Sequence, residues 1–178
     1  MKKLIVIYGL IAGLIVTSWM IIGMTNLFGS HIQGSLLLGY STMLVAFSLV
    51  FVSVKTYRDK QNNGTITFGK AFQIGIFITL IASSIYVLVW LVDYYYFTPD
   101  FFEKYSAHEI AKMKAAGASA AEIQKQTAAN ESYGKLYRNP FYNAMFTYME
   151  ILPVGLLVSL VAALVLKRKR VNPIAGQA

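Results

Sequence analysis

Apolar and polar residues alternate in blocks along the chain, and four apolar blocks are long enough to cross a lipid bilayer. A membrane-spanning helix needs roughly 20 consecutive apolar residues. The four blocks comprise residues 4–24, 36–54, 71–97 and 141–166. Lipid offers the backbone no hydrogen-bond partner, and these blocks are too long for the strands of a barrel, so each is predicted to be an α-helix.

The sizeable polar segment, residues 98–140, carries signals for two further helices. Thr98 is expected to be the N-cap of the first of them, which Gly117 should end. The sequence SAAE at Ser119–Glu122 has the spacing of a capping box, so a second short helix is expected over residues 120–129.

Shorter signals mark the ends of the apolar blocks. Asn63 and Gly64 tolerate the positive φ of a tight turn, which predicts a hairpin between the second and third blocks. Thr67 is expected to cap the third spanning helix, and Asn139, followed by Pro140, is expected to cap the fourth.

Composition agrees with a membrane protein. Hydrophobic residues make up 56% of the 178 residues and charged residues 13%, whereas soluble domains carry about 25% charged residues. The first block is longer than the core of a signal peptide, which is about 7–15 residues, so it is interpreted as a retained span. The prediction is a single all-α domain over residues 1–178, an integral membrane four-helix bundle with a helical extracytoplasmic segment before the last span.

The distribution of basic residues predicts the orientation. If both termini and the central hairpin are cytoplasmic, that side holds ten basic residues and one acidic residue. The segment 98–140 on the opposite side holds six basic and five acidic residues. Because basic residues close to span ends favour the cytoplasmic side, cytoplasmic N- and C-termini are predicted.

Basic residues flank the central hairpin and are predicted to contact anionic lipid headgroups, each contributing about 1 kcal/mol near such a surface. They are Lys55, Arg58, Lys60 and Lys70. Residues 64–70 also match the GxxxxGK pattern of a phosphate-binding loop, but that loop needs a following Ser or Thr and a preceding strand. Ala71 follows here. The membrane interpretation is therefore preferred, and no nucleic-acid partner is expected.

Small residues recur at four-residue spacing in three of the spans, and each stripe lies on one helix face. Such stripes let helices approach closely in lipid. They are candidates for packing within the bundle or for a homodimer surface. The stripes are Gly9 and Gly13 in the first span, Ala71, Gly75, Thr79 and Ser83 in the third, and Gly155, Ser159 and Ala163 in the fourth.

Two acids interrupt the spans, Glu150 and Asp93. An acid at the centre of a span costs roughly 2.5–3.5 kcal/mol on insertion scales, which makes it a functional candidate. Glu150 is placed near mid-bilayer, three residues before a helix-kinking Pro153, and Asp93 near the outer end of its span. Glu150 is either a proton or cation site or a structural acid bonded to a hydroxyl of the third span. The candidate hydroxyls are those of Thr79, Ser83 and Ser84.

Motifs for catalysis or for a cofactor are not found. The absence of cysteine excludes disulfides, thiolate metal sites and cysteine nucleophiles. His31 and His108 each stand without a second ligand at metal-binding spacing. We therefore expect no enzyme activity, no cofactor and no bound metal.

Three stretches, "YRDK", "ITFGKAF" and "EILPVGL", together with the pattern of the whole chain, resemble a membrane family called domain of unknown function 4199, which is common in Bacteroidetes. The resemblance implies a bacterial inner-membrane protein with four helices. It implies no reaction, substrate or catalytic residue.

Two functions remain open from the sequence. The first is a structural or accessory role in the envelope, with the lipid bilayer and either a second copy or another envelope protein as partners. The alternative is a proton- or ion-coupled carrier of a small solute, expected to be homodimeric, in which Glu150 is the coupling acid.

Overall fold

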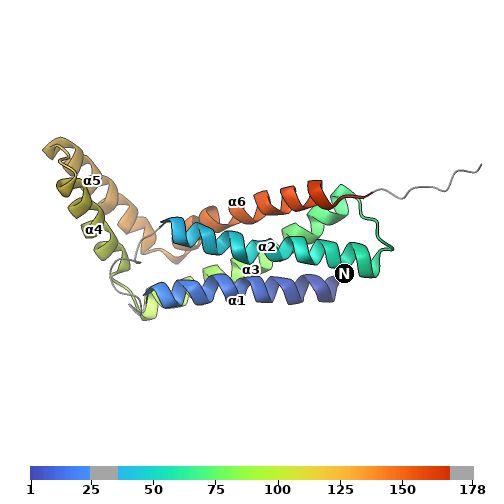
Figure 1. The fold of residues 1–178 in the computed structure, drawn as a ribbon. Helices are drawn as coiled ribbons and strands as arrows, with labels where there is room; N and C mark the ends of the chain where they lie inside the picture. Colours follow the sequence, from blue (N-terminus) through green and yellow to red (C-terminus); the bar gives the residue numbers. More distant parts are fainter. Residues whose placement is uncertain (25–35, 169–178) are drawn as a thin grey trace, which may run out of the picture.

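The computed structural model describes residues 1–24 and 36–168, and this part of the chain is almost entirely helical (Figure 1). Four of its helices are long and apolar enough to cross a membrane, which confirms the predicted fold class. In chain order the helices are α1 (Lys2–Met24), α2 (Leu36–Gln61), α3 (Phe68–Tyr96), α4 (Phe101–Ala115), α5 (Ala120–Tyr137) and α6 (Pro140–Leu166).

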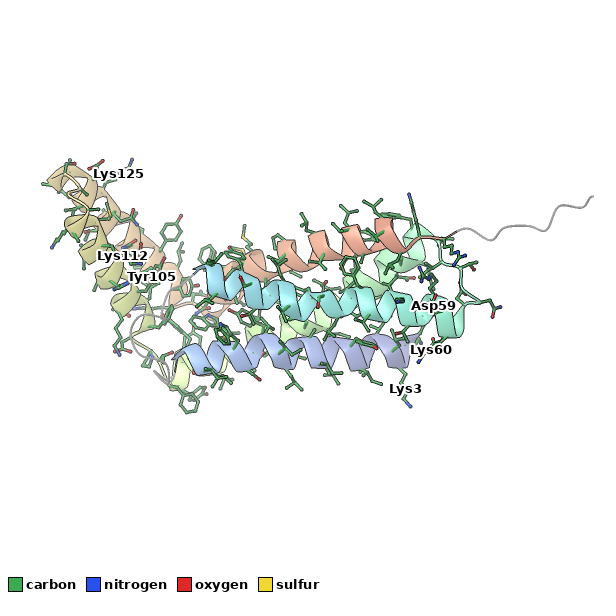
Figure 2. All side chains as sticks on the ribbon, in the orientation of Figure 1. Lys3, Asp59, Lys60, Tyr105, Lys112 and Lys125 are labelled. Carbon is green, nitrogen blue, oxygen red and sulfur yellow. The ribbon has the colours of Figure 1, made fainter. Side chains whose placement is uncertain are left out.

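The four long helices form a bundle in which α3 packs between α1 and α6, and α2 packs against α1 and α6 on the other side. The two shorter helices, α4 and α5, form an antiparallel hairpin that projects from one end of the bundle (Figure 1). Charged side chains gather at the two ends of the molecule. Figure 2 shows Lys3, Asp59 and Lys60 at the end with the N-terminus, and Lys112 and Lys125 on the hairpin.

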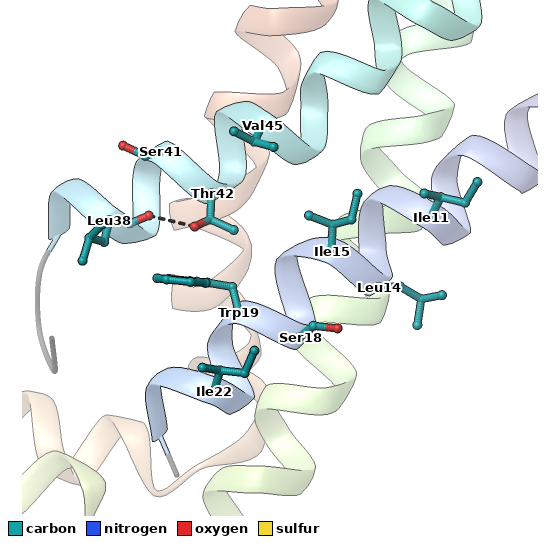
Figure 3. Close-up of a pocket in the computed structure, with 10 residues that line it drawn as sticks. All are labelled: Ile11, Leu14, Ile15, Ser18, Trp19, Ile22, Leu38, Ser41, Thr42 and Val45. Atoms are coloured by element: carbon teal, nitrogen blue, oxygen red, sulfur yellow. Dashed lines mark hydrogen bonds between the residues drawn. The ribbon is translucent and has the colours of Figure 1, made fainter. Parts of the chain in front are cut away.

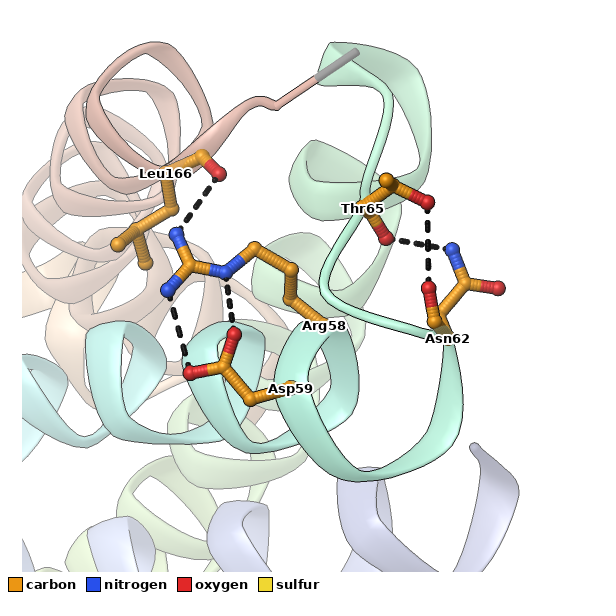
Figure 4. A network of polar contacts seen from close by, with 5 residues as sticks. All are labelled: Arg58, Asp59, Asn62, Thr65 and Leu166. Carbon is orange, nitrogen blue, oxygen red and sulfur yellow. Dashed lines mark hydrogen bonds and ion pairs between the residues drawn. The ribbon is translucent and has the colours of Figure 1, made fainter. Parts of the chain in front are cut away.

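Three contacts hold the ends of four helices together at the end opposite the hairpin. The backbones of Ile66 and Arg168 exchange two hydrogen bonds of 3.0 and 2.8 Å. The amino group of Met1 donates to the side chain of Gln61 at 2.9 Å. Arg58 donates to the carbonyl of Leu166 at 3.4 Å (Figure 4). The start of α1, the α2–α3 turn and the end of α6 therefore share one face of the bundle.

The second spanning helix is longer than predicted. It runs to Gln61 instead of ending near residue 54, so Lys55, Arg58 and Lys60 lie in its last two turns. Lys and Arg are good helix formers, and their long side chains let a helix continue beyond the apolar zone. The predicted turn is confined to residues 62–67, where Asn63 and Gly64 have φ values of 51° and 73°.

Most of the predicted caps are present. Thr67 caps α3 and Asn139 caps α6, while Ser119 and Glu122 form a complete capping box at the start of α5. The prediction for Thr98 was wrong, because α4 begins at Phe101 and the Thr98 hydroxyl donates to Asp93 Oδ2 at 2.9 Å. Thr98 therefore belongs to the end of α3.

The first hairpin helix ends just before Gly117, which has a φ of 77°. The second hairpin helix is much longer than the predicted 120–129, since α5 continues to Tyr137. Its later turns gain aromatic contacts with α3, α4 and α6, and tertiary packing of this kind extends helices beyond their local signals.

The bundle is tightest between α3 and α6, where small residues face each other. A Cβ atom added to Gly75 would lie 2.6 Å from both Cβ and Oγ of Ser159. A Cβ on Gly155 would meet the side chains of Thr79 and Phe47. Across this contact the hydroxyls of Thr79 and Ser159 are hydrogen-bonded at 3.2 Å. Close backbone approach replaces the hydrophobic driving force that lipid removes.

The small residues of α1 serve a similar contact with α3. A Cβ atom on Gly9 would lie 2.8 Å from Ile81 Cβ, and one on Gly13 would lie 2.7 Å from Ile85 Cδ1. The branched side chains of α3 thus fill the surface that these two glycines leave open.

Replacing Gly75 by alanine should lower the free energy of unfolding by about 1–3 kcal/mol, because the new methyl group overlaps Ser159, including its Cα at 3.1 Å. Thermal unfolding in detergent, followed by circular dichroism, measures the change. The control is Gly69→Ala on the same helix, where an added Cβ meets nothing within 4 Å. Equal unfolding temperatures for the two variants would contradict this account of the α3–α6 contact.

Candidate functional site

The junction between the bundle and the hairpin is built around a buried asparagine. Asn143, in the first turn of α6, is fully buried, and its Oδ1 accepts a hydrogen bond of 2.8 Å from the indole nitrogen of Trp90. Its Nδ2 donates to the carbonyl of Tyr137, the last residue of α5, at 3.2 Å. One amide side chain therefore joins α3, α5 and α6.

Aromatic rings surround this amide and link four helices. Trp90 packs edge-on against Phe101 at 4.9 Å between ring centroids, which ties α3 to the start of α4. Tyr137 contacts Tyr94 on α3, Phe102 on α4 and Phe146 on α6, with centroid separations of 5.8, 5.3 and 5.8 Å. We call these residues the aromatic junction: Trp90, Tyr94, Phe101, Phe102, Tyr137, Asn143 and Phe146.

Further bonds fix the chain where α5 turns into α6. The hydroxyl of Tyr95 donates to the carbonyl of Arg138 at 3.0 Å, and the side chain of Arg138 pairs with Glu103 of α4 at 3.2 Å. Burial raises the pKa of the Tyr137 phenol to about 12, and the charge of Glu150 adds to the shift. The residues of the aromatic junction are thus buried or half-buried, and their contacts link the hairpin to the bundle.

The hairpin itself has a thin interface. Asn130 is the buried residue of α5, while α4 has none. The Asn130 amide donates to Ser106 Oγ at 2.7 Å across the two helices. Most of the stability of a helix in a protein comes from tertiary packing. Because α4 and α5 bury so little against each other, they depend on the aromatic junction for this packing.

Glu150 lies on the outer surface of the bundle. Its side chain is exposed, and within the described residues its carboxylate makes no hydrogen bond or ion pair. The three hydroxyls predicted as hydrogen-bond partners of Glu150 do not bond to it. Thr79 is bonded to Ser159, and Ser84 is bonded to Tyr148 at 2.9 Å. Ser83 is fully buried with no partner for its hydroxyl in the described part of the chain.

Two tyrosines interact electrostatically with Glu150. Its carboxylate lies within electrostatic range of the hydroxyls of Tyr86 on α3 and Tyr137 on α5. Neither hydroxyl has a hydrogen-bond partner among residues 1–24 and 36–168. Glu150, Tyr86 and Tyr137 form a group that we call the acid–tyrosine group.

The contacts of Asp93, Pro153 and Lys70, the other candidates from the sequence, belong to helices and their ends. The carboxylate of Asp93 accepts the Thr98 hydroxyl, and its backbone carbonyl accepts the amides of Phe97 and Thr98, so Asp93 terminates α3. Pro153 lies within α6, and the helix continues through it to Leu166. Lys70 lies in the first turn of α3, directly after a helix cap. No cluster of three metal-ligating side chains occurs among the described residues.

Two open apolar grooves lie on the outside of the bundle. One, of about 570 Å³, runs between α1 and α2, with Trp19 and Thr42 in its walls (Figure 3). The other, of about 550 Å³, lies along the outer side of α6, between Phe141 and Leu156. Both are lined mainly by aliphatic and aromatic side chains, which suits contact with lipid chains.

These features define a polytopic α-helical membrane protein with a helical hairpin at one end of its bundle. The family described as Protein of unknown function (DUF4199) matches residues 7–168, and the chain belongs to this family. The family resemblance expected from the sequence is thus confirmed. Neither the comparison with curated proteins nor that with solved structures gives a match.

The sequence did not single out Asn143 or the ring contacts of Tyr137. A signal for Asn143 was present, because an amide one turn inside an apolar block needs a buried hydrogen-bond partner. Its partner, Trp90, lies 53 residues away, and that pairing requires the folded structure.

Replacing Trp90 by phenylalanine should keep the ring packing but leave the Asn143 carbonyl unpaired, at a cost of about 1–3 kcal/mol in the free energy of unfolding. The hairpin should also lose its fixed direction. Because the chain has no cysteine, two spin labels can be attached to one molecule through Lys60→Cys and Lys125→Cys. The distribution of distances between the two labels should be broader in Trp90→Phe than in the unchanged protein.

The matched control is Trp19→Phe, which removes an indole from the outer groove and not from the junction. It should leave both the unfolding temperature and the label distances unchanged. A narrow and unchanged distance distribution in Trp90→Phe would show that the Trp90–Asn143 bond does not fix the hairpin.

Proposed function

We propose that this protein is a membrane scaffold that presents the α4–α5 hairpin to a protein partner in the cell envelope. The observation that carries the proposal is the aromatic junction. Buried polar and aromatic side chains join α3, α4, α5 and α6 at one place, although four spans alone would anchor the chain. A rigid support of this kind is useful when the supported element must meet another molecule in a fixed direction.

The proposal includes a bacterial inner membrane and cytoplasmic termini. The basic residues of α1, α2 and the start of α3 lie at the end of the bundle that holds the N-terminus and the end of α6. Basic residues at span ends favour the cytoplasm. The hairpin then extends on the extracytoplasmic side, where its nearly balanced charge leaves a polar surface for a partner.

The alternative is a carrier that uses Glu150 for proton or ion coupling. The position of Glu150 favours the scaffold, because this acid is exposed and takes no part in the close glycine contact between α3 and α6. That contact is closed by Gly75, Gly155 and the Thr79–Ser159 hydrogen bond. Alternating access requires helices that separate around a central site, whereas close glycine packing resists separation. We propose that the protein has no catalytic activity.

Photo-crosslinking from the hairpin tests the scaffold function. A cysteine at Lys125, labelled with a membrane-impermeant maleimide–benzophenone, should give a discrete adduct with one envelope protein in native membranes. Cysteine at Lys60, at the opposite end of the bundle, is the matched control and should stay unlabelled in intact spheroplasts. The adduct should diminish in the Trp90→Phe background, since the hairpin direction is then lost. Identical adducts from both ends, or none, would reject the proposal.

Replacing Glu150 by glutamine separates the scaffold from the carrier. The scaffold predicts that purified protein in liposomes conducts no protons above the rate of empty liposomes, with or without the substitution. A carrier predicts measurable flux that falls at least tenfold in Glu150→Gln while folding, followed by circular dichroism, is preserved. Asp93→Asn is the control, because that acid is already bonded to Thr98. Flux that depends on Glu150 alone would replace the scaffold with the carrier.

A further inference from the structure

Exposed apolar side chains lie beside Glu150 on α6. Its neighbours Met149 and Leu157 are 66% and 62% exposed, so this side of α6 faces outward from the bundle. Glu150 lies ten residues after Pro140, about 15 Å along a helix that rises 1.5 Å per residue. The acid therefore stands at about the middle of the membrane, on a surface that meets lipid or another protein.

This chain has no counter-ion for Glu150 within the membrane. No Lys, Arg or His occurs in the four apolar blocks that form the spans. An acid exposed to lipid at this depth carries a free-energy cost, and acids in spans usually pair with a basic group or a polar neighbour. The missing basic group must come from another molecule if the acid is to be paired.

The surroundings of Glu150 suit an ammonium group. A lysine ammonium has three donors and no acceptor. The carboxylate offers acceptor oxygens, and the hydroxyls of Tyr86 and Tyr137 lie in electrostatic range without partners of their own in the described part of the chain. The Glu150 carboxylate thus offers acceptor oxygens on an exposed side of α6, with two tyrosines in electrostatic range.

A second copy of the chain is a poorer occupant. Two copies related by a two-fold axis close to Glu150 would bring two identical acids together, and two adjacent carboxyl groups in a low-dielectric medium cannot both be ionised. A span with a basic residue instead supplies the opposite charge and hydrogen-bond donors in one group.

From these observations we propose that the acid–tyrosine group is an intramembrane docking point for a partner's transmembrane helix that carries a lysine or arginine at the depth of Glu150. This inference rests on the proposed scaffold function and names the second surface through which the partner is held. The hairpin would meet the partner outside the membrane, and Glu150 would fix its depth within it.

A designed peptide tests the docking point without knowledge of the natural partner. Single-span Leu/Ala peptides with one central lysine, with that lysine moved two turns along the helix, or with leucine in its place are labelled with an acceptor dye. The protein carries a donor dye at Lys60→Cys, and both are placed in phosphatidylcholine vesicles. Interhelical polar contacts in lipid are worth about 1–2 kcal/mol, so the central-lysine peptide should bind roughly five- to thirtyfold more tightly than the leucine peptide.

Variants of the protein assign the effect to Glu150. Glu150→Gln should remove most of the preference for the central lysine, while Asp93→Asn should keep it, because Asp93 lies at the end of its helix and is bonded to Thr98. If Glu150→Gln unfolds, the three peptides on the native protein still decide the question. Equal binding of all three peptides would overturn the docking point.

Self-association is the other outcome to be measured. Donor- and acceptor-labelled copies of the protein, mixed without peptide, should show no energy transfer that depends on Glu150. Transfer that is lost in Glu150→Gln would make a second copy the occupant and overturn the proposal. Neither result affects crosslinking from Lys125→Cys, so failure of this inference can be told apart from failure of the scaffold function.

Discussion

The inability of lipid to form hydrogen bonds is the constraint on which this structure depends. It forces the four spans to be helical, since only a helix satisfies its backbone within one segment. Lipid chains are also as apolar as the helix surfaces, so no hydrophobic drive joins the helices, and the bundle relies on close approach at Gly75 and Gly155 and on the Thr79–Ser159 hydrogen bond. Each polar side chain inside the membrane must find a partner or carry a free-energy cost. The same rule thus governs backbone, packing and polar groups.

The aromatic junction holds together the end of α3 and the start of α6. The chain must leave the membrane after α3, form a hairpin of modest stability and re-enter as α6, and the two crossing points must be held together. Asn143 does this with one amide that accepts from Trp90 and donates to the Tyr137 carbonyl. Rings around it exclude water and strengthen both bonds, because a hydrogen bond gains in a low-dielectric surrounding. The hairpin direction follows from the interior of the protein and not from the hairpin's own contacts.

Much of this architecture could be predicted from local signals. The lengths of the apolar blocks predict the spans, and the caps at Thr67, Ser119 and Asn139 act within a few residues of themselves. Errors occurred where distant contacts decide the outcome. Thr98 bonds back to Asp93, and α5 continues to Tyr137 because aromatic rings from three other helices cover its last turn. The partners of Asn143 and the outward position of Glu150 depend on how helices rotate against one another, which no local pattern contains.

Glu150 is the ionisable side chain that departs from this rule, whereas the other departures in the described residues are the buried hydroxyls of Thr17, Ser53 and Ser83. Other polar side chains of α6 are paired, since Asn143 bonds to Trp90, Tyr148 to Ser84 and Ser159 to Thr79. A structural acid would have been placed among these hydroxyls, where a partner was at hand. Glu150 instead faces outward, between exposed apolar neighbours, on a chain whose spans contain no basic residue. An acid that destabilises the isolated bundle, and is stabilised when it pairs with a basic group, favours the associated state over the free state. The departure therefore indicates an interaction surface within the membrane.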